Sequence, residues 1–403
     1  MGISRRDFIK TGAATLSAFM IPGLRPLRSY ASTTDPVLIV LYLRGGADGL
    51  TMVVPAFDPL YYANRPTIQV PPGSELPLND GFGFGLNPAL ADLLPLYQSG
   101  DLAIIHASGS PDPSRSHFDA QDFMDHASPG DKAVVEGWIN RYLTVAGGGL
   151  ALSGVTLAKK KTKAMLGPAP TLAFSSIEKF SLAGQSTPER RAALETRYGI
   201  EQGTLLGDTV TDAFDAVDVI ASVDTTTSVI YPDGDLGPLL KDAAALIKAD
   251  VGIRVIAIDL GGWDHHSGQI ARMNALGTEL SSGLAAFYSD LGPCAATSLT
   301  LCMTEFGRRV GENGGGGSDH GHGGIMLALG GGIAGGRVLL DGAAWPGLEE
   351  ENLFIGQDLQ ATTDFRNIFA EALGSHMQLS TPAMAPIFPD FSVDPANYPG
   401  LYL

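Results

Sequence analysis

Short runs of hydrophobic residues recur along this chain, separated by segments with a different hydrophobic period. Runs rich in valine, isoleucine and leucine and flanked by glycine or polar residues are typical of buried β-strands. The predicted strands cover 37–43, 102–107, 253–259, 298–303 and 325–329. Apolar residues at helical spacing predict helices over 87–100, 239–248 and 269–291. Strands that alternate with helices predict a three-layer α/β/α sandwich with a mostly parallel central sheet.

Each predicted strand lies next to a cluster of polar side chains. Four strands lead into such a cluster, and the fifth cluster directly precedes the strand at 325–329. The clusters cover 44–48, 115–119, 264–266, 304–309 and 319–322. In an open parallel sheet the ligand crevice lies outside the carboxyl ends of the strands, where loops far apart in sequence meet. We therefore predict an active site at this edge of the sheet.

Five of the eight histidines and several aspartates lie within these clusters. Histidine and carboxylate ligands from several loops are the usual mixture around zinc and similar divalent cations. The predicted metal ligands are Asp48, Asp264, His266, Asp319, His320 and His322. A single Asp–His pair is often only a hydrogen-bonded pair, but two such pairs together with Asp48 favour metal binding. We expect one or two divalent ions, zinc first, with Ca²⁺, Mg²⁺ or Mn²⁺ as alternatives.

The local backbone supports several of these ligands. On an extended segment neighbouring side chains point to opposite sides, so Asp264 and His266 can share a direction while His265 faces away. Glycines on both sides of residues 319–322 permit tight, positive-φ backbone that turns the side chains inward. The alternative, a flexible surface loop, accounts for the glycines but not for the closely spaced histidines.

The chain is acidic, with a formal net charge of −17 at pH 7. This charge argues against nucleic acid as a partner. Basic residues beside the clusters can still form a local positive pocket. We predict that an anionic substrate is bound by Arg44, Arg115, His117 and Arg308. The alternative is that each arginine forms an ion pair with a nearby carboxylate.

The first 31 residues have the pattern of a twin-arginine export signal. Two adjacent arginines lie within Ser4–Lys10, an apolar stretch follows, and Ser29–Ala31 offers small residues to a signal peptidase. We therefore expect the twin-arginine export machinery as a partner and a periplasmic or secreted location. Residues 32–403 are predicted to form one domain, with a helical insertion or cap at about 145–250. No apolar stretch after the N-terminus approaches the ~20 residues of a membrane-spanning helix, so we predict no stable membrane span.

Two further patterns concern cofactors and redox chemistry. Gly330–Gly335 fits a dinucleotide-binding glycine pattern, but the sequence after it is typical of extended chain, so no helix start faces a pyrophosphate. Cys294 and Cys302 are the only cysteines. They could form one disulfide in an exported protein, or Cys302 could be a small buried hydrophobic residue within its strand.

Six motifs follow one another along the chain after the signal. They are Leu43–Leu50, Ser116–Gln121, Gly137–Leu143, Trp263–His266, Thr304–Arg309 and Asp319–Gly324. In this order they resemble the twin-arginine-exported family catalogued as domain of unknown function 1501. That family is grouped with alkaline phosphatase-like and sulfatase-like proteins. The resemblance implies an alkaline phosphatase-like α/β sandwich with a two-metal site at the carboxyl ends of the strands.

The resemblance also implies roles for single residues. Ser116 matches the nucleophile position, and Asp48 matches the metal-binding aspartate after the first strand. The Asp264–His266 and Asp319–His320 pairs match metal-binding pairs, and His322 matches a final histidine ligand. No Cys-x-Pro-x-Arg segment, from which sulfatases make formylglycine, occurs in the chain. Phosphate esters are therefore expected ahead of sulfate esters.

Alternative roles remain open for two residues. Bound metal would lower the pKa of Ser116 or of a water and stabilise an in-line displacement at phosphorus or sulfur. Ser116 could also be a helix N-cap, and the two roles are compatible. Glu305 could ligate a metal or act as a catalytic base, or it could form a structural salt bridge with Arg308 or Arg309.

Two functions follow from these expectations. The first is an exported metal-dependent hydrolase that acts on an anionic small-molecule or polymer ester, preferring phosphate to sulfate. The alternative is a non-catalytic cell-envelope binding or assembly protein on the same fold, with a structural or vestigial metal site. Fold alone does not decide between them.

Overall fold

The computed structural model describes residues 35–147, 151–180 and 215–402, together with 189, 192–193 and 196–197. The chain divides into two compact units, Met1–Tyr30 and Ala31–Leu403, and the fold below is that of the second unit. The predicted twin-arginine signal at 1–31 lies outside the described residues.

A nine-stranded sheet forms the centre of this unit, with the order β11-β5-β10-β9-β1-β8-β6-β7 and with β12 paired to β5. Its strands are β1 (Val37–Leu43), β5 (Leu102–Gly109), β6 (Gly154–Leu157), β7 (Leu172–Phe174), β8 (Val255–Leu260), β9 (Ser298–Met303), β10 (Gly324–Gly330), β11 (Arg337–Leu339) and β12 (Thr363–Asp364). Every pairing among these described strands is parallel except the two made by β10.

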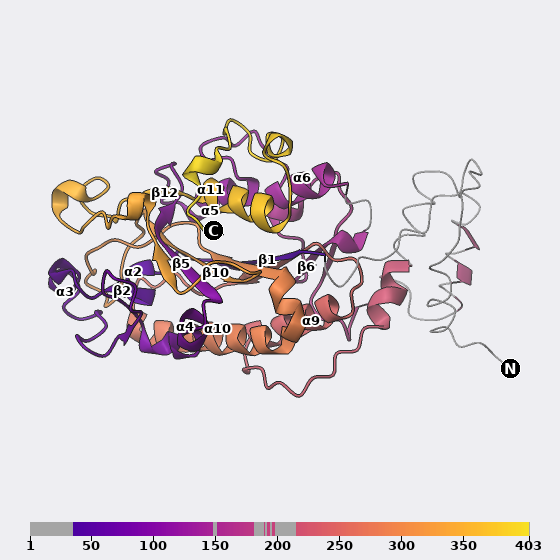
Figure 1. Ribbon diagram of the computed structural model, residues 1–403, viewed down its shortest axis with the longest axis horizontal. Helices are drawn as coiled ribbons and strands as arrows, with labels where there is room; N and C mark the ends of the chain where they lie inside the picture. Colours follow the sequence, from indigo (N-terminus) through magenta and orange to yellow (C-terminus); the bar gives the residue numbers. More distant parts are fainter. Residues whose placement is uncertain are drawn as a thin grey trace. The chain divides into compact units, whose positions relative to one another are not determined.

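Helices cover both faces of the sheet (Figure 1). One face carries η1 (Pro88–Leu93), α4 (Leu94–Gln98), α9 (Leu236–Lys248) and α10 (Gln269–Leu291), and the other carries α5 (His117–His126), α6 (Trp138–Val145) and α11 (Phe365–Glu371). Strand β1 shows why two separate cores result. Its odd-numbered residues pack into the core with α9 and α10, and its even-numbered residues pack into the core with α6 and α11. The predicted three-layer α/β/α sandwich is confirmed.

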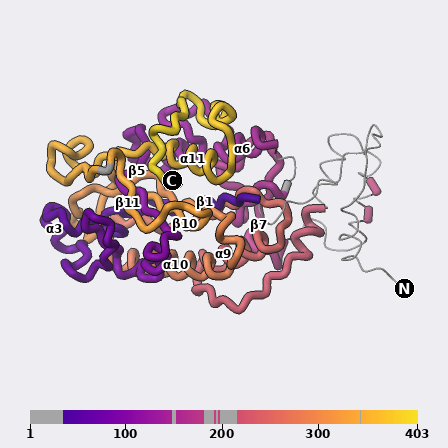
Figure 2. The backbone as a smooth tube through the Cα atoms, viewed as in Figure 1, coloured from indigo at the N-terminus to yellow at the C-terminus, as the bar shows by residue number. Residues whose placement is uncertain are grey.

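Smaller elements complete the described fold. The short sheet β2 (Val53–Pro55), β4 (Phe84–Leu86) and β3 (Leu76–Pro77) lies in the segment with α2 (Gly49–Met52) and α3 (Pro59–Asn64). The remaining single turns are η2 (Ala151–Ser153), η3 (Lys163–Met165), η4 (Gly292–Thr297), η5 (Asp341–Ala343), η6 (Glu350–Asn352), η7 (Ala372–His376), η8 (Thr381–Met384) and η9 (Pro395–Asn397). The C-terminal segment returns to α6, where Phe369 of α11 stacks on Trp138 with ring centroids 4.4 Å apart (Figure 2).

Strand β10 runs antiparallel to both of its neighbours, β5 and β9. The segment between β9 and β10 contains no helix that could cross over a sheet face, and a parallel neighbour needs such a crossover. The reversal has a direct consequence for the site. Because β10 is antiparallel, its first residues lie at the edge where the parallel strands end. Residues 319–322, which precede β10, therefore reach the same edge as the loops after β1, β8 and β9.

Other expectations differ from the structure in detail. The predicted helix over 87–100 is split into η1 and α4, and Pro95 near the start of α4 cannot donate a helical hydrogen bond. The predicted insertion at about 145–250 stays a prediction, because much of that range is not described. Its described parts include β6 and β7, which extend the central sheet, and α9.

Two expectations about single features have outcomes in the described residues. Cys294 and Cys302 are free thiols rather than a disulfide, and Cys302 is buried in β9. The glycine-rich segment at 330–335 is followed by strand β11, as the extended pattern predicts. Within the described ranges, no helix is both long enough and apolar enough to cross a bilayer.

Candidate metal centre

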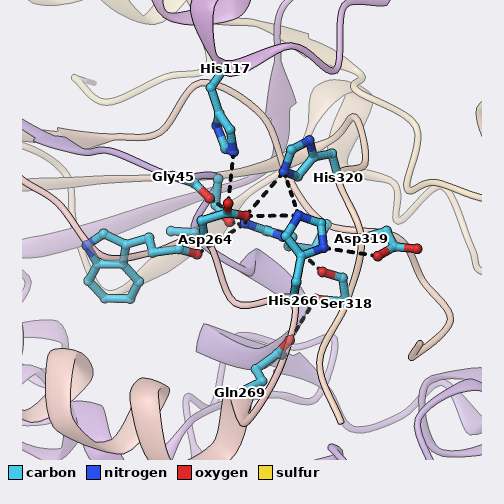
Figure 3. Close-up of polar contacts among 12 residues, drawn as sticks. Gly45, His117, Asp264, His266, Gln269, Ser318, Asp319 and His320 are labelled. Carbon is cyan, nitrogen blue, oxygen red and sulfur yellow. Dashed lines mark hydrogen bonds and ion pairs between the residues drawn. The ribbon is translucent and has the colours of Figure 1, made fainter. Parts of the chain in front are cut away.

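Three segments far apart in sequence bring four metal-capable side chains together at the edge of the sheet. Asp264 and His266 lie in the loop between β8 and α10, and His117 is the first residue of α5 after β5. His320 lies just before β10. Figure 3 shows the three imidazole rings directed at the Asp264 carboxylate. We call these four residues the metal cluster.

The ligand atoms of the metal cluster are close to one another. His266 Nε2 lies 2.9 Å from His320 Nε2 and 3.1 Å from Asp264 Oδ1, while His320 Nε2 lies 3.2 Å from the same oxygen. His117 Nε2 lies 3.4 Å from Asp264 Oδ2. Single ligand atoms of His117, Asp264 and His320 also lie within 4.8 Å of one another.

The hydrogen-bond partners of the Nδ1 atoms show that the Nε2 lone pairs of the three histidines face the centre of the metal cluster. His117 Nδ1 lies 2.7 Å from Glu305 Oε1 and His266 Nδ1 lies 3.0 Å from Asp319 Oδ1. His320 Nδ1 lies 2.8 Å from the carbonyl oxygen of Arg115. All three partners are acceptors, so each neutral ring carries its proton on Nδ1 and turns the Nε2 lone pair toward the others.

The centre of the cluster therefore consists of acceptors alone and requires a proton or a cation among them. His117 Nε2 is buried and has no hydrogen-bond partner. Tetrahedral zinc with bonds of ~2.0–2.2 Å has ligand atoms roughly 3.3–3.6 Å apart, close to the spacing found here. Histidine ligands whose second nitrogen donates to a carboxylate or a carbonyl are the usual arrangement around such metals. His117, Asp264 and His320 thus fit a divalent cation, and His266 lies close enough to His320 and Asp264 to join them.

The charge of the surroundings also fits a cation. Asp264, Glu305 and Asp319 contact the three rings, and Arg308 is the one guanidinium bonded to Asp264, with Nη2 to Oδ1 at 2.6 Å. Partial burial would raise the pKa of Asp264, but the adjoining Arg308 guanidinium lowers it to about 2. Three carboxylates and one guanidinium leave two negative charges beside neutral imidazoles, which a divalent cation would balance.

Glu305 is a buried carboxylate that orients His117. Its Oε1 accepts hydrogen bonds from the backbone N–H of Gly45, from His117 and from Gln121. Burial raises the pKa of Glu305, but the hydrogen bonds from His117 and Gln121 outweigh burial and hold that pKa below its usual value. The hydrogen bond between His117 and Glu305 also raises the pKa of His117. Glu305 therefore pairs with His117 and not, as the alternative had it, with Arg308 or Arg309.

Asp319 stays next to the cluster but faces away from its centre (Figure 3). Its Oδ1 accepts from His266 and from Asn313 Nδ2 at 3.0 Å, and the bond from Asn313 lowers the pKa of Asp319. In this position Asp319 orients the ring of His266, and its carboxylate is not directed at the centre of the cluster. His265, predicted to face away from Asp264 and His266, is buried, whereas those two residues are exposed.

Asp48 lies in a different environment. It is buried and forms an ion pair with the buried Arg65, with Nη1 to Oδ2 at 2.6 Å. It also caps α2 and accepts from Thr51 Oγ1 at 2.9 Å and from Gln269. Every contact shown for its carboxylate is to these donors, so the geometry does not bring Asp48 into the metal cluster.

His322 also lies apart from the cluster. Its ring stacks on Phe354 with centroids 4.0 Å apart, and burial lowers its pKa to about 4. The lowered pKa keeps the buried imidazole neutral where it packs against the aromatic ring. The predicted final ligand is therefore not among the residues that the structure brings together.

Three arginines predicted to bind substrate are already engaged. Arg44 pairs with Asp125 and Asp259 at 2.9 and 3.0 Å, and Arg115 pairs with Asp358. Arg308 is buried under the cluster, where it donates to Asp264 and to backbone carbonyls that include those of Gly46 and Ser318. The alternative of ion-paired arginines holds for all three.

Ser116 and His117 begin α5, and they differ in exposure and contacts. Ser116 occupies the N-cap position, but its side chain makes no capping hydrogen bond and the residue is exposed. His117, predicted to bind substrate, instead joins the cluster. The spacing of four between His117 and Gln121 is the signal for this arrangement, because it places both side chains on one helix face toward Glu305.

Glycines at the cluster permit close approach of backbone segments. A Cβ on Gly45, whose φ is +124°, would lie 2.6 Å from the backbone nitrogen of Asp264. A Cβ on Gly321 would lie 2.4 Å from the carbonyl carbon of Arg308. Gly321 does not have a positive φ, so its role is close approach, whereas Gly316, before residues 319–322, has the positive φ expected of the flanking glycines, at +69°.

The chain is thus an α/β/α protein with a histidine-rich cluster that could hold a metal ion, at the carboxyl ends of the parallel strands. The family described as "Protein of unknown function (DUF1501)" matches residues 241–387, a segment that includes Asp264, His266 and His320. None of the curated proteins compared with the chain matches it.

Several solved structures are similar to the chain at low identity. The C-terminal periplasmic domain of EcEptC from Escherichia coli, in complex with Zn, is 10% identical over 73% of each chain, with a TM-score of 0.35. The PsFucS1 sulfatase from Pseudoalteromonas sp. is 12% identical over 75% of this chain and 64% of that chain, with a TM-score of 0.32. Alkaline phosphatase from the Antarctic bacterium TAB5 is 11% identical over 73% and 92%, with a TM-score of 0.30.

Proposed function

We propose that the protein is a metal-dependent hydrolase of phosphate esters, with sulfate esters as the less favoured class. The observation that carries the proposal is the convergence of three imidazole Nε2 atoms on the Asp264 carboxylate, each ring held at Nδ1 by an acceptor. Asp264, His266 and His320 would hold the cation, with His117 as a fourth ligand or as a proton carrier. A bound divalent ion, zinc first, supplies an activated water and stabilises negative charge on an ester oxyanion.

Residues of the metal cluster can transfer a proton and leave the site open to a substrate. His117 is oriented by Glu305 and has Nε2 free toward the centre, so it can accept the proton of an attacking hydroxyl and return it to the leaving oxygen. The side chains of Asp264 and His266 are each 45% exposed, which leaves room for a substrate. The attacking group is a water or the exposed hydroxyl of Ser116, which lies beside His117 at the start of α5.

One observation favours a second function. Four protein ligands would complete a tetrahedral zinc site, and a closed site of this kind is structural. In that case the protein would be a non-catalytic binding or assembly protein with a structural metal. Under either function, we expect a periplasmic or secreted location, an expectation that rests on the twin-arginine pattern at 1–31.

The test combines metal content with turnover. We expect about one zinc per chain and chelator-sensitive hydrolysis of p-nitrophenyl phosphate, and Asp264→Ala should lose both. Asp119→Ala removes an exposed carboxylate of α5 that pairs with Lys132, and it serves as the control that keeps both. Ser116→Ala separates the two nucleophiles, because full activity would assign the attack to water. Stoichiometric metal without turnover of phosphate or sulfate esters would support the structural alternative.

A further inference from the structure

Arg309 differs from the other arginines near the metal cluster because its guanidinium forms no hydrogen bond or ion pair within the described residues, and only the charges of Asp319 and Asp358 act on it. Its Nε is buried without a hydrogen-bond partner. Among the described residues, no carboxylate lies within salt-bridge distance of it, whereas Arg44, Arg115 and Arg308 each have such a partner. A buried guanidinium nitrogen without an acceptor is costly, because its hydration is lost and nothing replaces it.

The backbone explains why neighbouring arginines have different surroundings. Arg308 forms a bridge with His320, and Arg309 forms one with Asp358, so this stretch is extended. Successive side chains on extended chain point to opposite sides. Arg308 therefore reaches beneath the cluster to Asp264, while Arg309 lines a separate cavity of about 250 Å³. We call this cavity the Arg309 pocket.

The Arg309 pocket adjoins the metal cluster through one shared residue. Asp319 lines the pocket and accepts from Nδ1 of His266. Other polar residues of the lining are Asn64, Glu312, Asn313 and Gln357. The volume is below the ~300–1,000 Å³ of pockets that hold a whole ligand, so it suits one arm of a ligand whose other end lies elsewhere.

The carboxylates in the lining have hydrogen-bond donors of their own, and Arg309 acts on Asp319 only through its charge, without a hydrogen bond or an ion pair. Glu312 accepts from the backbone N–H groups of Thr67 and Ile68 and from the Thr67 hydroxyl. Asp319 Oδ1 accepts from Asn313 and His266. A planar guanidinium that is free on one side of an open pocket is suited to a carboxylate or to a phosphate oxygen pair.

We propose that the Arg309 pocket is a subsite for a second anionic group of the substrate. The substrate is then an ester with at least two anionic groups. The reactive ester lies at the metal cluster, and a carboxylate or further phosphate of the same molecule binds Arg309. This inference rests on the proposed function, since it assumes that the reactive ester lies over His266 and Asp264.

The test uses non-hydrolysable probes and the zinc-loaded full-length protein. Isothermal titration compares phosphonoalkanoates of increasing length with alkylphosphonates of the same length, which lack the carboxylate. We expect one phosphonoalkanoate to bind about tenfold or more tighter than its partner, because a charge-assisted bond to a guanidinium is gained. Arg309→Met should abolish this difference and leave alkylphosphonate affinity unchanged, while Arg309→Lys should keep part of it.

A charge-matched control excludes a general effect of net charge. Lys179→Met removes one exposed positive charge after β7, the outermost strand of the sheet on that side, and should keep the full carboxylate advantage. An advantage that survives Arg309→Met, or none in the unmodified protein, overturns the inference alone. If neither probe series binds and chromogenic esters are not turned over, the proposed function fails together with it. Replacing the carboxylate by a second phosphonate shows which anion the pocket prefers.

Discussion

Two aspartates that follow neighbouring strands, Asp48 after β1 and Asp264 after β8, have opposite surroundings. Asp48 is buried and saturated by Arg65, Thr51 and Gln269. Asp264 is half-exposed, and three imidazole lone pairs converge on it. Each aspartate has a buried arginine at 2.6 Å, Arg65 for Asp48 and Arg308 for Asp264, so the arginine does not distinguish them. The other contacts of Asp48 are all to hydrogen-bond donors, which suits a carboxylate that stabilises the fold. The other contacts of Asp264 are to three imidazole nitrogens, and this convergence of lone pairs is what favours an added cation there.

The largest effect is expected from breaking the buried ion pair between Asp48 and Arg65, which should lower stability without changing metal binding. Asp48→Ala leaves Arg65 buried without its partner, and removal of one member of a buried ion pair costs about 3–5 kcal/mol of unfolding free energy. Urea denaturation should show this loss, while zinc content stays at the level of the unmodified protein. Asp48→Asn keeps the capping oxygen and should lose less. Loss of zinc in a folded Asp48→Asn variant would contradict the separation of the two regions.

A smaller effect is expected from the residue that orients His266. Asp319→Ala removes the acceptor at Nδ1 and should weaken zinc binding about 10–100-fold, or about 1.4–2.7 kcal/mol. Asp319→Asn retains an acceptor oxygen and should fall between that variant and the unmodified protein. Competition with a chelator of known affinity measures each constant. An unchanged zinc affinity in Asp319→Ala would show that Asp319 has no role at the centre.

The smallest effect is expected from His106, a buried histidine outside the metal cluster, and it concerns how stability depends on pH. His106 is fully buried, donates from Nε2 to the Val53 carbonyl in its neutral form, and burial lowers its pKa to about 4. The unfolded chain takes up a proton near pH 6.5 and the folded one does not, so stability present above that pH is lost as pH falls toward 4. Between pH 7 and pH 5 this residue alone should cost about 1–2 kcal/mol.

Denaturation at both pH values tests this contribution. His106→Gln keeps a donor and an acceptor but cannot titrate, so its stability should fall less between pH 7 and pH 5 than that of the unmodified protein. His117 shows the opposite behaviour, because its hydrogen bond to Glu305 raises its pKa. If the unfolding free energy of His106→Gln fell as much between pH 7 and pH 5 as that of the unmodified protein, the loss of stability in acid would come from other groups.

Much of the site could be predicted from local pattern. The hydrophobic runs predict β1, β9 and the limits of α10, because a strand or helix that buries a whole face must show it in its period. The alternation around Asp264 predicts that His265 is turned away, since neighbouring side chains of an extended segment point oppositely. These features depend on residues a few positions apart.

The partners of charged groups could not be predicted in this way, because they come from distant parts of the chain. Asp48 and Asp264 both follow a strand and a glycine, and both pair with a buried arginine. Only the side chains brought in by the fold separate them, donors around Asp48 and imidazole rings around Asp264. His117 and Glu305 are 188 residues apart in sequence. The reversal of β10, which brings His320 to the other ligands, is likewise a property of the assembled sheet. The sequence by itself therefore determined which segments carry the chemistry, and tertiary packing decided which lone pairs meet.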